Sequence, residues 1–213
     1  TGNGKTIIAP VQGSLMRLDL NDRYIACRLY AGDYEPVETA LLKKNIKAGM
    51  TVADIGANIG YDTLIAARLV GNSGIVYAFE PAPARFSSLA QNIILNGYQN
   101  VVAFQKAVSD KEGTAIFSLN PVNYGDNRIV GHSQALTIEV ETVALDEVLR
   151  KEKEVHVIKM DIQGAEYRAV LPRPKFGFDA SSVSDLLDLI EVEAMRVTAP
   201  PLGIALPDAR DLP

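Results

Sequence analysis

Asp54, Gly56 and Gly60 lie close together in the stretch VADIGANIGYDTLIAA, where an apolar, strand-like run is followed by a pattern of helical period. Glycine allows a tight turn and a close approach of the backbone to a ligand. The carboxylate of Asp54 beside such a turn attracts an ammonium or sulfonium group and repels a phosphate. These residues therefore predict a site for a nucleotide or nucleoside between a strand and a helix.

Three classes of ligand bind at such a turn, and the spacing of the glycines separates them. A nucleoside triphosphate needs a phosphate loop, but the related stretch GNGKT at residues 2–6 lacks the earlier glycine and the following helix. A dinucleotide such as NAD is bound by G-x-G-x-x-G, whereas Asn58 takes the place of the middle glycine here. S-Adenosylmethionine needs no cradle for a diphosphate, so the turn favours it, and an NAD-dependent oxidoreductase is the weaker alternative.

Glu80 ends the next apolar run, IVYAFE, about twenty residues beyond the glycine turn. An acid at the end of that strand accepts hydrogen bonds from the ribose hydroxyls of a bound nucleoside. It suits any nucleoside with a free 2′-hydroxyl, so alone it does not separate a dehydrogenase from a methyltransferase. Together with the changed glycine spacing, it favours the methyltransferase.

Methyl transfer to a hydroxyl requires a group that takes up the hydroxyl proton. The candidates are Asp161 and Lys159 at the end of the run VHVIKMD, His132 in a loop rich in Gly, Asn and Asp, and Glu166 on the following turn. Lys159 and Asp161 are two residues apart and share one face of a strand, which predicts an ion pair at its rim. A purely structural role for that pair is the alternative. His156 is expected to be an ordinary strand residue, and no spacing of potential ligands calls for a metal ion.

The loop NPVNYGDNRIVGHSQ contains groups that suit a polyhydroxylated acceptor. Amides, an aromatic ring and an ion-pair-capable couple occur together there, and a hydroxyl both donates and accepts hydrogen bonds. A solvated turn has a similar composition, so both interpretations stay open. The predicted acceptor-binding residues are Asn123 and Asn127 in this loop and Glu166 beyond it.

From Met50 onward, strand-like and helix-like segments alternate along the sequence, and these segments must position the residues named above. The predicted strands are Val52–Ile55, Ile75–Phe79, Val101–Val108 and residues 155–161, and the predicted helices are Tyr61–Val70, Ala84–Asn96 and Leu145–Lys151. Such alternation predicts an α/β fold with a doubly wound, mostly parallel sheet and helices on both faces. Between residues 114 and 143 the apolar residues alternate with polar ones, which predicts an antiparallel insertion.

The first 49 residues are expected to pack on this core as a lid or preface. The runs KTIIAPV and RYIACRLY are predicted strands, and a helix is predicted from Pro36 to Lys47, ending at Gly49. Residues 50–213 form the predicted ligand-binding domain. The proline-rich tail has no clear period, and a final pair of strands cannot be placed after Ala194.

Composition limits the class of protein. The chain has 213 residues, 47% hydrophobic and 22% charged, with a formal net charge of -5, as expected for one globular domain without a basic surface for nucleic acid. Cys27 is the single cysteine, so no intrachain disulfide forms and a reducing compartment is expected. The sequence lacks an apolar run of about 20 residues and a basic-then-apolar leader, so a cytoplasmic location is expected. The insertion at residues 114–143 is a candidate surface for a homodimer.

The joint pattern resembles the FkbM family of S-adenosylmethionine-dependent methyltransferases. The resemblance runs from about Tyr34 to Glu166 and is carried by VADIGANIGYDTLIAARLVGNSGIVYAFEPAPARFSSLAQNIILNG, KAVSD and VIKMDIQGAE. It implies the class I methyltransferase fold, a Rossmann-like sheet with S-adenosylmethionine across its strand ends. It also implies methylation of hydroxyl groups on sugars, glycolipids or polyketides.

The resemblance also assigns cofactor-binding residues. It implies that Glu80 holds the ribose, that Ala107 and Val108 lie beside the adenine, and that the methionine part is surrounded by Asp54, Gly56, Asn58, Gly60 and Tyr61. Residues 159–166 are similar to the family pattern K-x-D-x-E-G-x-E, with Gln163 in place of the first glutamate. This departure and the unplaced tail are the support for an alternative function, a non-catalytic module that binds the cofactor or a glycan.

Overall fold

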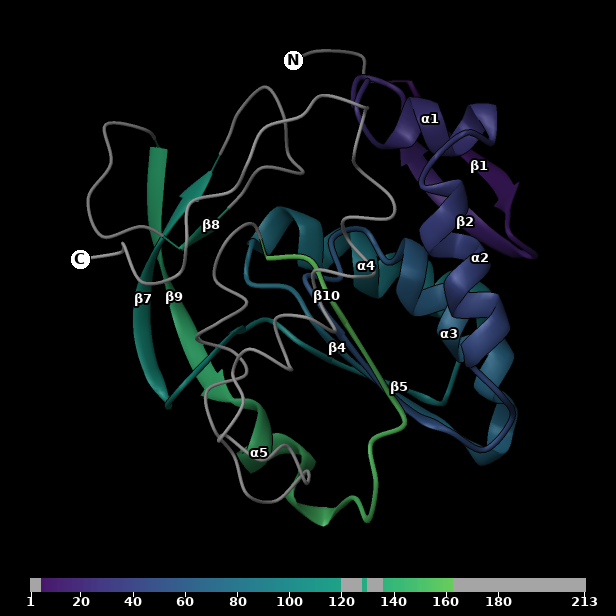
Figure 1. Ribbon diagram of the computed structural model, residues 1–213. Helices are drawn as coiled ribbons and strands as arrows, with labels where there is room; N and C mark the ends of the chain where they lie inside the picture. The colour runs from purple at the N-terminus through teal and green to yellow at the C-terminus, as the bar shows by residue number, and fades with distance from the viewer. Residues whose placement is uncertain (1–4, 120–127, 130–135, 163–213) are drawn as a thin grey trace, which may run out of the picture.

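A parallel sheet of four strands in the order β10-β3-β4-β5 forms the centre of the protein (Figure 1). The computed structural model describes residues 5–119, 128–129 and 136–162. The strands are β3 (Thr51–Ile55), β4 (Ile75–Phe79), β5 (Val101–Phe104) and β10 (Val157–Met160). All five residues of β3 are buried, as expected for a parallel strand that is covered on both faces.

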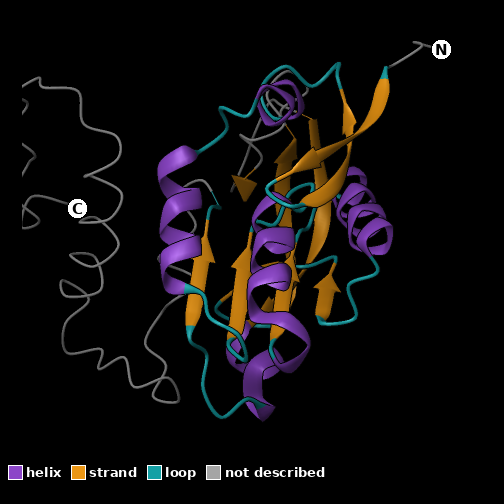
Figure 2. Ribbon diagram, turned by 90° about the vertical axis from the view of Figure 1, so that its right-hand side faces the viewer, coloured by secondary structure: helices purple, strands orange, loops and turns teal. Residues whose placement is uncertain are grey.

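Helices cover both faces of this sheet, as the sequence predicts. α3 (Tyr61–Val70) and α4 (Pro83–Asn96) connect β3 to β4 and β4 to β5, and their apolar residues share a core with Val52 and Val76. The opposite face, with Ala53 and Phe79, packs on the short α5 (Leu145–Val148) and the 3₁₀ turn η2 (Leu149–Lys151). Figure 2 shows the strands side by side with helices packed against them.

The order of the strands creates a switch point. From β3 the chain moves through α3 and β4 toward β5, whereas β10 returns to the other side of β3 and pairs with it in parallel. The connection that leaves β3 thus runs to one side of this strand, whereas β10 pairs on its other side, and such a switch point places a crevice at the carboxyl ends of the two strands. The residues Asp54 to Gly60 follow directly at this edge.

The predicted strand Val101–Val108 is instead two strands in two sheets. β5 ends at Phe104, and after Gln105 and Lys106 the chain begins β6 (Ala107–Ser109), which pairs in parallel with β9 (Leu136–Ala144). The two strands differ in their pairing partners. The carbonyl of Phe104 accepts a hydrogen bond from the amide of Glu80, directly after β4, whereas β6 pairs with β9. Apolar residues on both sides of Gln105 and Lys106 do not reveal such a change of partner.

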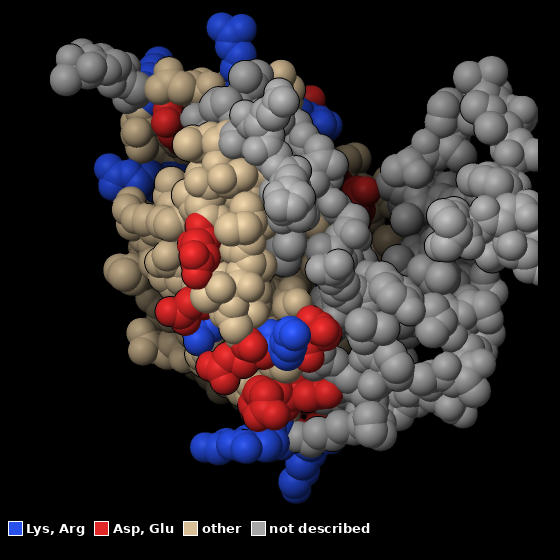
Figure 3. All heavy atoms as spheres, turned by 90° about the vertical axis from the view of Figure 1, so that its left-hand side faces the viewer, with Lys and Arg blue, Asp and Glu red and all other residues tan. Residues whose placement is uncertain are grey.

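The predicted antiparallel insertion is confirmed. β7 (Gly113–Leu119) pairs antiparallel with β9 in a register that runs from Gly113↔Thr142 to Leu119↔Leu136, and β8 (Arg128–Ile129) adds to β7. Figure 3 shows the side of the molecule where this sheet lies, with acidic and basic side chains interspersed among uncharged ones. Phe117 and Val140 pack on Ala82 and Ala107, which brings β7 against the edge where the crevice lies.

The N-terminal segment differs from its prediction in one element. β1 (Thr6–Val11) is a strand as predicted, but it pairs with β2 (Ser14–Asp19) through a turn at Gln12 and Gly13, both with positive φ. The run RYIACRLY is not a strand, because it forms helix α1 (Ala26–Ala31). The carboxylate of Asp22 accepts the amides of Tyr24 and Ile25, which starts a helical turn there. The predicted helix at Pro36 is confirmed as α2 (Pro36–Asn45).

Side chains of α4 connect the N-terminal hairpin to the centre of the protein. Asn92, which is fully buried, accepts the amide of Arg17 at 2.7 Å and donates to the carbonyl of Ile59 at 2.8 Å. Arg85 forms a partly buried ion pair with Asp22 at 2.9 Å. Within residues 5–49, apolar side chains from Ala9 to Ile46 thereby share one core with α3 and α4. No helix within the described ranges is long and apolar enough to cross a membrane.

Candidate functional site

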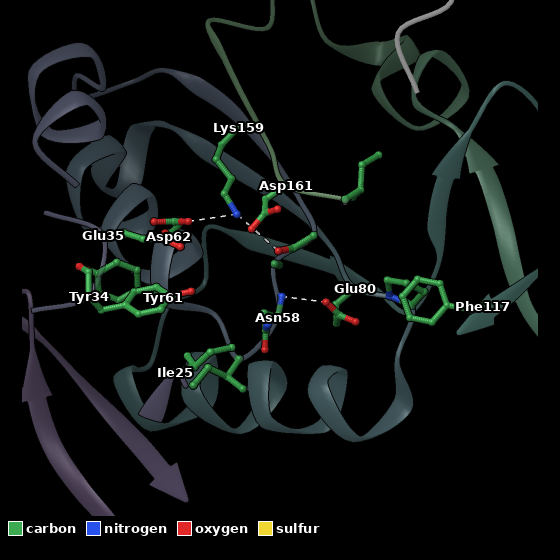
Figure 4. A pocket seen from close by; sticks show the side chains of 15 residues that line it. Ile25, Tyr34, Glu35, Asn58, Tyr61, Asp62, Glu80, Phe117, Lys159 and Asp161 are labelled. Carbon is green, nitrogen blue, oxygen red and sulfur yellow. Dashed lines mark hydrogen bonds and ion pairs between the residues drawn. The ribbon is translucent and has the colours of Figure 1, made fainter. Parts of the chain in front are cut away.

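A cleft lies at the carboxyl ends of β3 and β10, at the switch point of the sheet. Its empty volume is about 650 Å³, counting the part that is open to solvent. Figure 4 shows side chains from distant parts of the chain converging on it. The lining residues are Ile25, Tyr34, Glu35, Gly56, Ala57, Asn58, Ile59, Tyr61, Asp62, Glu80, Pro81, Phe117, Lys159, Asp161 and Ile162.

The floor of the cleft is the turn between β3 and α3, and glycine is required there. Gly56 has φ +85°, and a Cβ on it would lie 2.0 Å from the carbonyl oxygen of Asp161. Gly60 has φ +98°, and its Cβ would lie 2.9 Å from a methyl group of Leu89. Asn58 also has a positive φ, 51°, which Asn tolerates better than most residues. At Gly56 the turn therefore packs against the backbone that follows β10 more closely than any side chain would allow, and at Gly60 the positive φ favours glycine.

Glu80 holds the turn to the end of β4. Its two carboxylate oxygens each accept one backbone amide, from Asn58 and from Ala82, both at 2.8 Å. The residue is 6% exposed, and this burial raises the pKa of Glu80 to about 7 against the two stabilising amides. Glu80 thus has a structural role that the sequence did not indicate, while its predicted contact with a ribose stays a prediction.

Lys159 is surrounded by carboxylates. Its Nζ lies 3.1 Å from Oδ2 of Asp62, 3.5 Å from Oδ1 of Asp54 and 3.5 Å from the carbonyl oxygen of Gly56. Burial alone lowers the pKa of Lys159, but Asp54 and Asp62 outweigh it and raise that pKa well above its ordinary value. Lys159 is therefore an ammonium ion at neutral pH. It bridges β10, the glycine turn and the first turn of α3.

The structure brings the other predicted cofactor residues to the same region. Tyr61 is buried beside the cleft, and its hydroxyl is 2.7 Å from that of Thr39. Ala107 and Val108 are buried on β6 and line an adjoining hollow that also touches Gly56 and Phe117. Asp161 lies exposed at the mouth of the cleft next to Lys159 (Figure 4). Four predicted residues lie outside the described residues, namely Asn123, Asn127, His132 and Glu166.

Two acids of the cleft, Glu35 and Asp62, were missed from the sequence. Asp62 lies in the first turn of α3, where an acid is common because it stabilises the helix, so its presence carried no functional signal. Glu35 precedes α2 and reaches the cleft through the packing of α2 on α3, which no local pattern indicates. Burial, followed by the charge of Asp62, raises the pKa of Glu35.

A metal centre finds no support in the described part of the chain. Within those ranges no group of three or more His, Cys, Asp or Glu side chains is arranged to hold a metal ion. Two of the acids there, Asp54 and Asp62, are paired with the ammonium group of Lys159.

Comparison with known proteins gives concordant matches. The sequence profile of the Methyltransferase FkbM domain matches residues 54–194, more than half of the chain, and confirms the resemblance indicated by the motifs. "Methyltransferase 1" of Beauveria bassiana (strain ARSEF 2860) is 28% identical over 113 residues, which cover 53% of this chain and 44% of that protein. "Methyltransferase sdnD" of Sordaria araneosa is 26% identical over 155 residues, covering 57% of this chain and 60% of that protein.

Among solved structures, that of M. jannaschii TYW2 in complex with AdoMet is 27% identical, with a TM-score of 0.39. The match covers 49% of this chain and 44% of that one. The chain thus spans only part of the length of the curated relatives that it matches.

Proposed function

Because this chain belongs to the FkbM methyltransferase family, we propose that it transfers the methyl group of S-adenosylmethionine to a hydroxyl group of a sugar, glycolipid or polyketide-type acceptor. The family and S-adenosylmethionine as its cofactor agree with the prediction from the sequence. The hydroxyl as the methylated group and the class of the acceptor are the proposal.

The observation that carries the proposal is the charge of the cleft beside a glycine turn. Asp54, Asp62 and Glu80 surround the turn, and Lys159 is the one cation among the described lining residues. A diphosphate would face these acids, whereas a nucleoside with a sulfonium group is attracted by them. The residues therefore fit S-adenosylmethionine and disfavour NAD, the ligand of the alternative oxidoreductase.

Each cofactor-binding residue has a proposed part. Glu80 would accept hydrogen bonds from the ribose, and the small apolar surfaces of Ala107 and Val108 would lie against the adenine. The turn formed by Gly56, Asn58 and Gly60, with Asp54 beneath it and Tyr61 beside it, would approach the methionine part. In this position the close approach of the backbone excludes water from one side of the ligand.

The bound cofactor supplies a methyl group on a sulfonium with a neutral thioether as leaving group. Positioning contributes much of the rate of such a displacement, and the acceptor hydroxyl must still lose its proton. Lys159 is already protonated, so we assign it to holding Asp54 and Asp62 rather than to taking up that proton. Asp161, exposed at the mouth of the cleft, is the proposed base, and His132 remains a candidate outside the described residues.

The test is methyl transfer from labelled S-adenosylmethionine to a panel of sugars, glycolipids and polyketides, with amines and carboxylic acids as comparison acceptors. We expect label in an O-methyl group, identified by mass spectrometry and NMR. Label on nitrogen or carbon alone would contradict the proposed reaction. Tight binding of S-adenosylhomocysteine without transfer to any acceptor would instead favour the non-catalytic module.

A further inference from the structure

The end of the cleft away from Glu80 carries an excess of negative charge. Glu35, Asp62 and Asp161 line it, and Asp54 lies directly beneath. Lys159 is the one cation that the described residues contribute there, so four carboxyl groups face a single ammonium. We call these four acids the acidic end of the cleft. Figure 4 shows Glu35 and Asp62 on one side of Asn58, with Glu80 and Phe117 on the other.

Asp62 has a hydrogen-bonding position that the described residues leave open. Its Oδ2 lies 3.1 Å from Nζ of Lys159. Its Oδ1 is buried and has no hydrogen-bond partner within the described ranges, and the whole residue is 7% exposed. A buried carboxylate oxygen without a donor is unfavourable. Because Asp62 lines the cleft, a bound ligand can supply that donor.

Glu35 is held at the cleft by an unusual backbone. It has φ 44° and ψ 58°, in the left-handed region, and although it is the N-cap residue of α2 its side chain caps no amide of that helix. The neighbouring Tyr34 is fixed by the edge of its ring on Tyr61, with centroids 5.3 Å apart, and its carbonyl accepts the hydroxyl of Tyr61 at 3.4 Å. A strained conformation that the surroundings maintain is typical of a functional position.

We propose that Glu35 and Asp62 bind the α-ammonium group in the methionine part of S-adenosylmethionine. The assignment rests on the proposed function, because it takes the nucleoside to lie at Glu80, Ala107 and Val108. The methionine part then extends past Asn58 toward the acidic end. An ammonium group has three N–H donors, which match the open Oδ1 of Asp62 and the carboxylate of Glu35, and its charge offsets the excess of acids.

A comparison of two ligands tests the assignment. S-Adenosylhomocysteine carries the α-ammonium group, whereas 5′-methylthioadenosine has the same nucleoside and thioether without it. We expect Glu35→Gln to weaken S-adenosylhomocysteine about ten- to hundredfold, the range for a lost charge-assisted hydrogen bond, and to leave 5′-methylthioadenosine within about twofold. Glu38→Gln on α2, which removes the same charge outside the cleft lining, is the matched control and should change neither affinity.

Removing the amino group from the ligand tests the same contact without depending on a single protein variant. S-Adenosylhomocysteine without its amino group should bind wild-type protein about as weakly as the natural compound binds Glu35→Gln. Combining both changes should cost less than the sum of the two losses, because each removes the same contact. Calorimetry gives the affinities, and circular dichroism checks that both variants are folded.

The assignment would be overturned if Glu35→Gln bound S-adenosylhomocysteine as tightly as the wild type does, or if the losses in the combined experiment were additive. Either result would leave the proposed function intact. A wild-type protein that binds neither nucleoside would overturn the proposed function and the assignment together.

Discussion

Single residues at the turn of the cleft combine structural and binding roles. Gly56 allows β10 to approach the turn, and Glu80 accepts two amides that fix the turn to β4. Substitutions at these positions therefore change both stability and ligand affinity, and a matched control is needed to separate the two effects.

Because the backbone contact at Gly56 is very close, we predict that Gly56→Ala strongly lowers the free energy of unfolding. The new Cβ would lie 2.0 Å from the carbonyl oxygen of Asp161, at a φ of +85°. Strain of this kind costs roughly 1–3 kcal/mol, and the clash with β10 adds to it. Gly97→Ala is the control, because Gly97 has a φ of +65° with nothing within 4 Å of its Cβ position. Urea unfolding should show the larger loss for Gly56→Ala, and equal losses would mean that β10 yields without cost.

The raised pKa of Glu80 predicts that nucleoside binding depends on pH. A ribose hydroxyl donates to the charged carboxylate, and with a pKa of about 7 in the free protein the charged fraction grows as the pH rises from 6 to 8. The affinity for 5′-methylthioadenosine, which lacks the ammonium group, should rise over this interval by at most about tenfold per pH unit. Calorimetry at several pH values measures it, and Glu80→Gln should show a flat profile. A flat profile in the wild type would remove Glu80 from the ribose site.

The raised pKa of Glu80 also makes the stability of the folded protein depend on pH. Here the contribution falls as the pH rises, whereas the affinity for the nucleoside increases. The folded-state pKa of Glu80, about 7, lies above its ordinary value of 4.5. Between these values the unfolded chain releases a proton that the folded protein keeps, so this residue's contribution to stability is full below about pH 4.5 and falls as the pH rises to about 7. The difference in unfolding free energy between wild type and Glu80→Gln, measured across this range, should show that fall. A difference that grows with pH would contradict the assigned pKa.

At the scale of elements, α4 connects the N-terminal hairpin to the turn of the cleft. Asn92 bonds both Arg17 in β2 and Ile59 in the turn, while Asn96 bonds the backbone of Leu15 in β2 on both sides. The side-chain amide of Asn92 therefore bonds to both the hairpin and the turn, whereas that of Asn96 bonds to the hairpin and not to the turn. This arrangement allows the effect on the hairpin to be separated from the effect on the cleft.

This difference between the two asparagines predicts separable effects of substitution. Asn92→Ala leaves the buried carbonyl of Ile59 and the partly buried amide of Arg17 without partners, which costs about 2 kcal/mol of stability. It also frees Ile59, so affinity for S-adenosylhomocysteine should fall. Asn96→Ala should lower stability without changing that affinity. Unfolding and binding measured on both variants check this expectation. A loss of affinity in Asn96→Ala as large as in Asn92→Ala would show that the hairpin itself supports the cleft.

At the scale of the whole molecule, local signals account for the elements that were predicted correctly. The boundaries of α3 and β4 match those of the sequence, because a buried strand followed by a helical pattern and a glycine is distinctive. The run RYIACRLY was misread, since eight residues with several apolar side chains fit either period. The split between β5 and β6 depends on which strand each one meets, and such long-range pairing leaves no local trace.

The cleft shows the same limit. Asp54, Gly56 and Glu80 were found because their spacing follows from one strand-turn-helix unit and its successor. Glu35 belongs to a segment that precedes the central sheet in the sequence, and only the packing of α2 on α3 brings it to the cleft beside Asp62. Residues that converge from distant segments are therefore the part of the site that sequence spacing did not provide.

A crystal structure of the chain with S-adenosylhomocysteine would locate the cofactor site directly. We predict that the ligand lies in the cleft at the switch point, with its ribose hydroxyls on Glu80, its adenine beside Ala107 and Val108, and its amino group between Glu35 and Asp62. A ligand bound outside this cleft, or lying in it with the adenine at the acidic end, would contradict the proposed cofactor site.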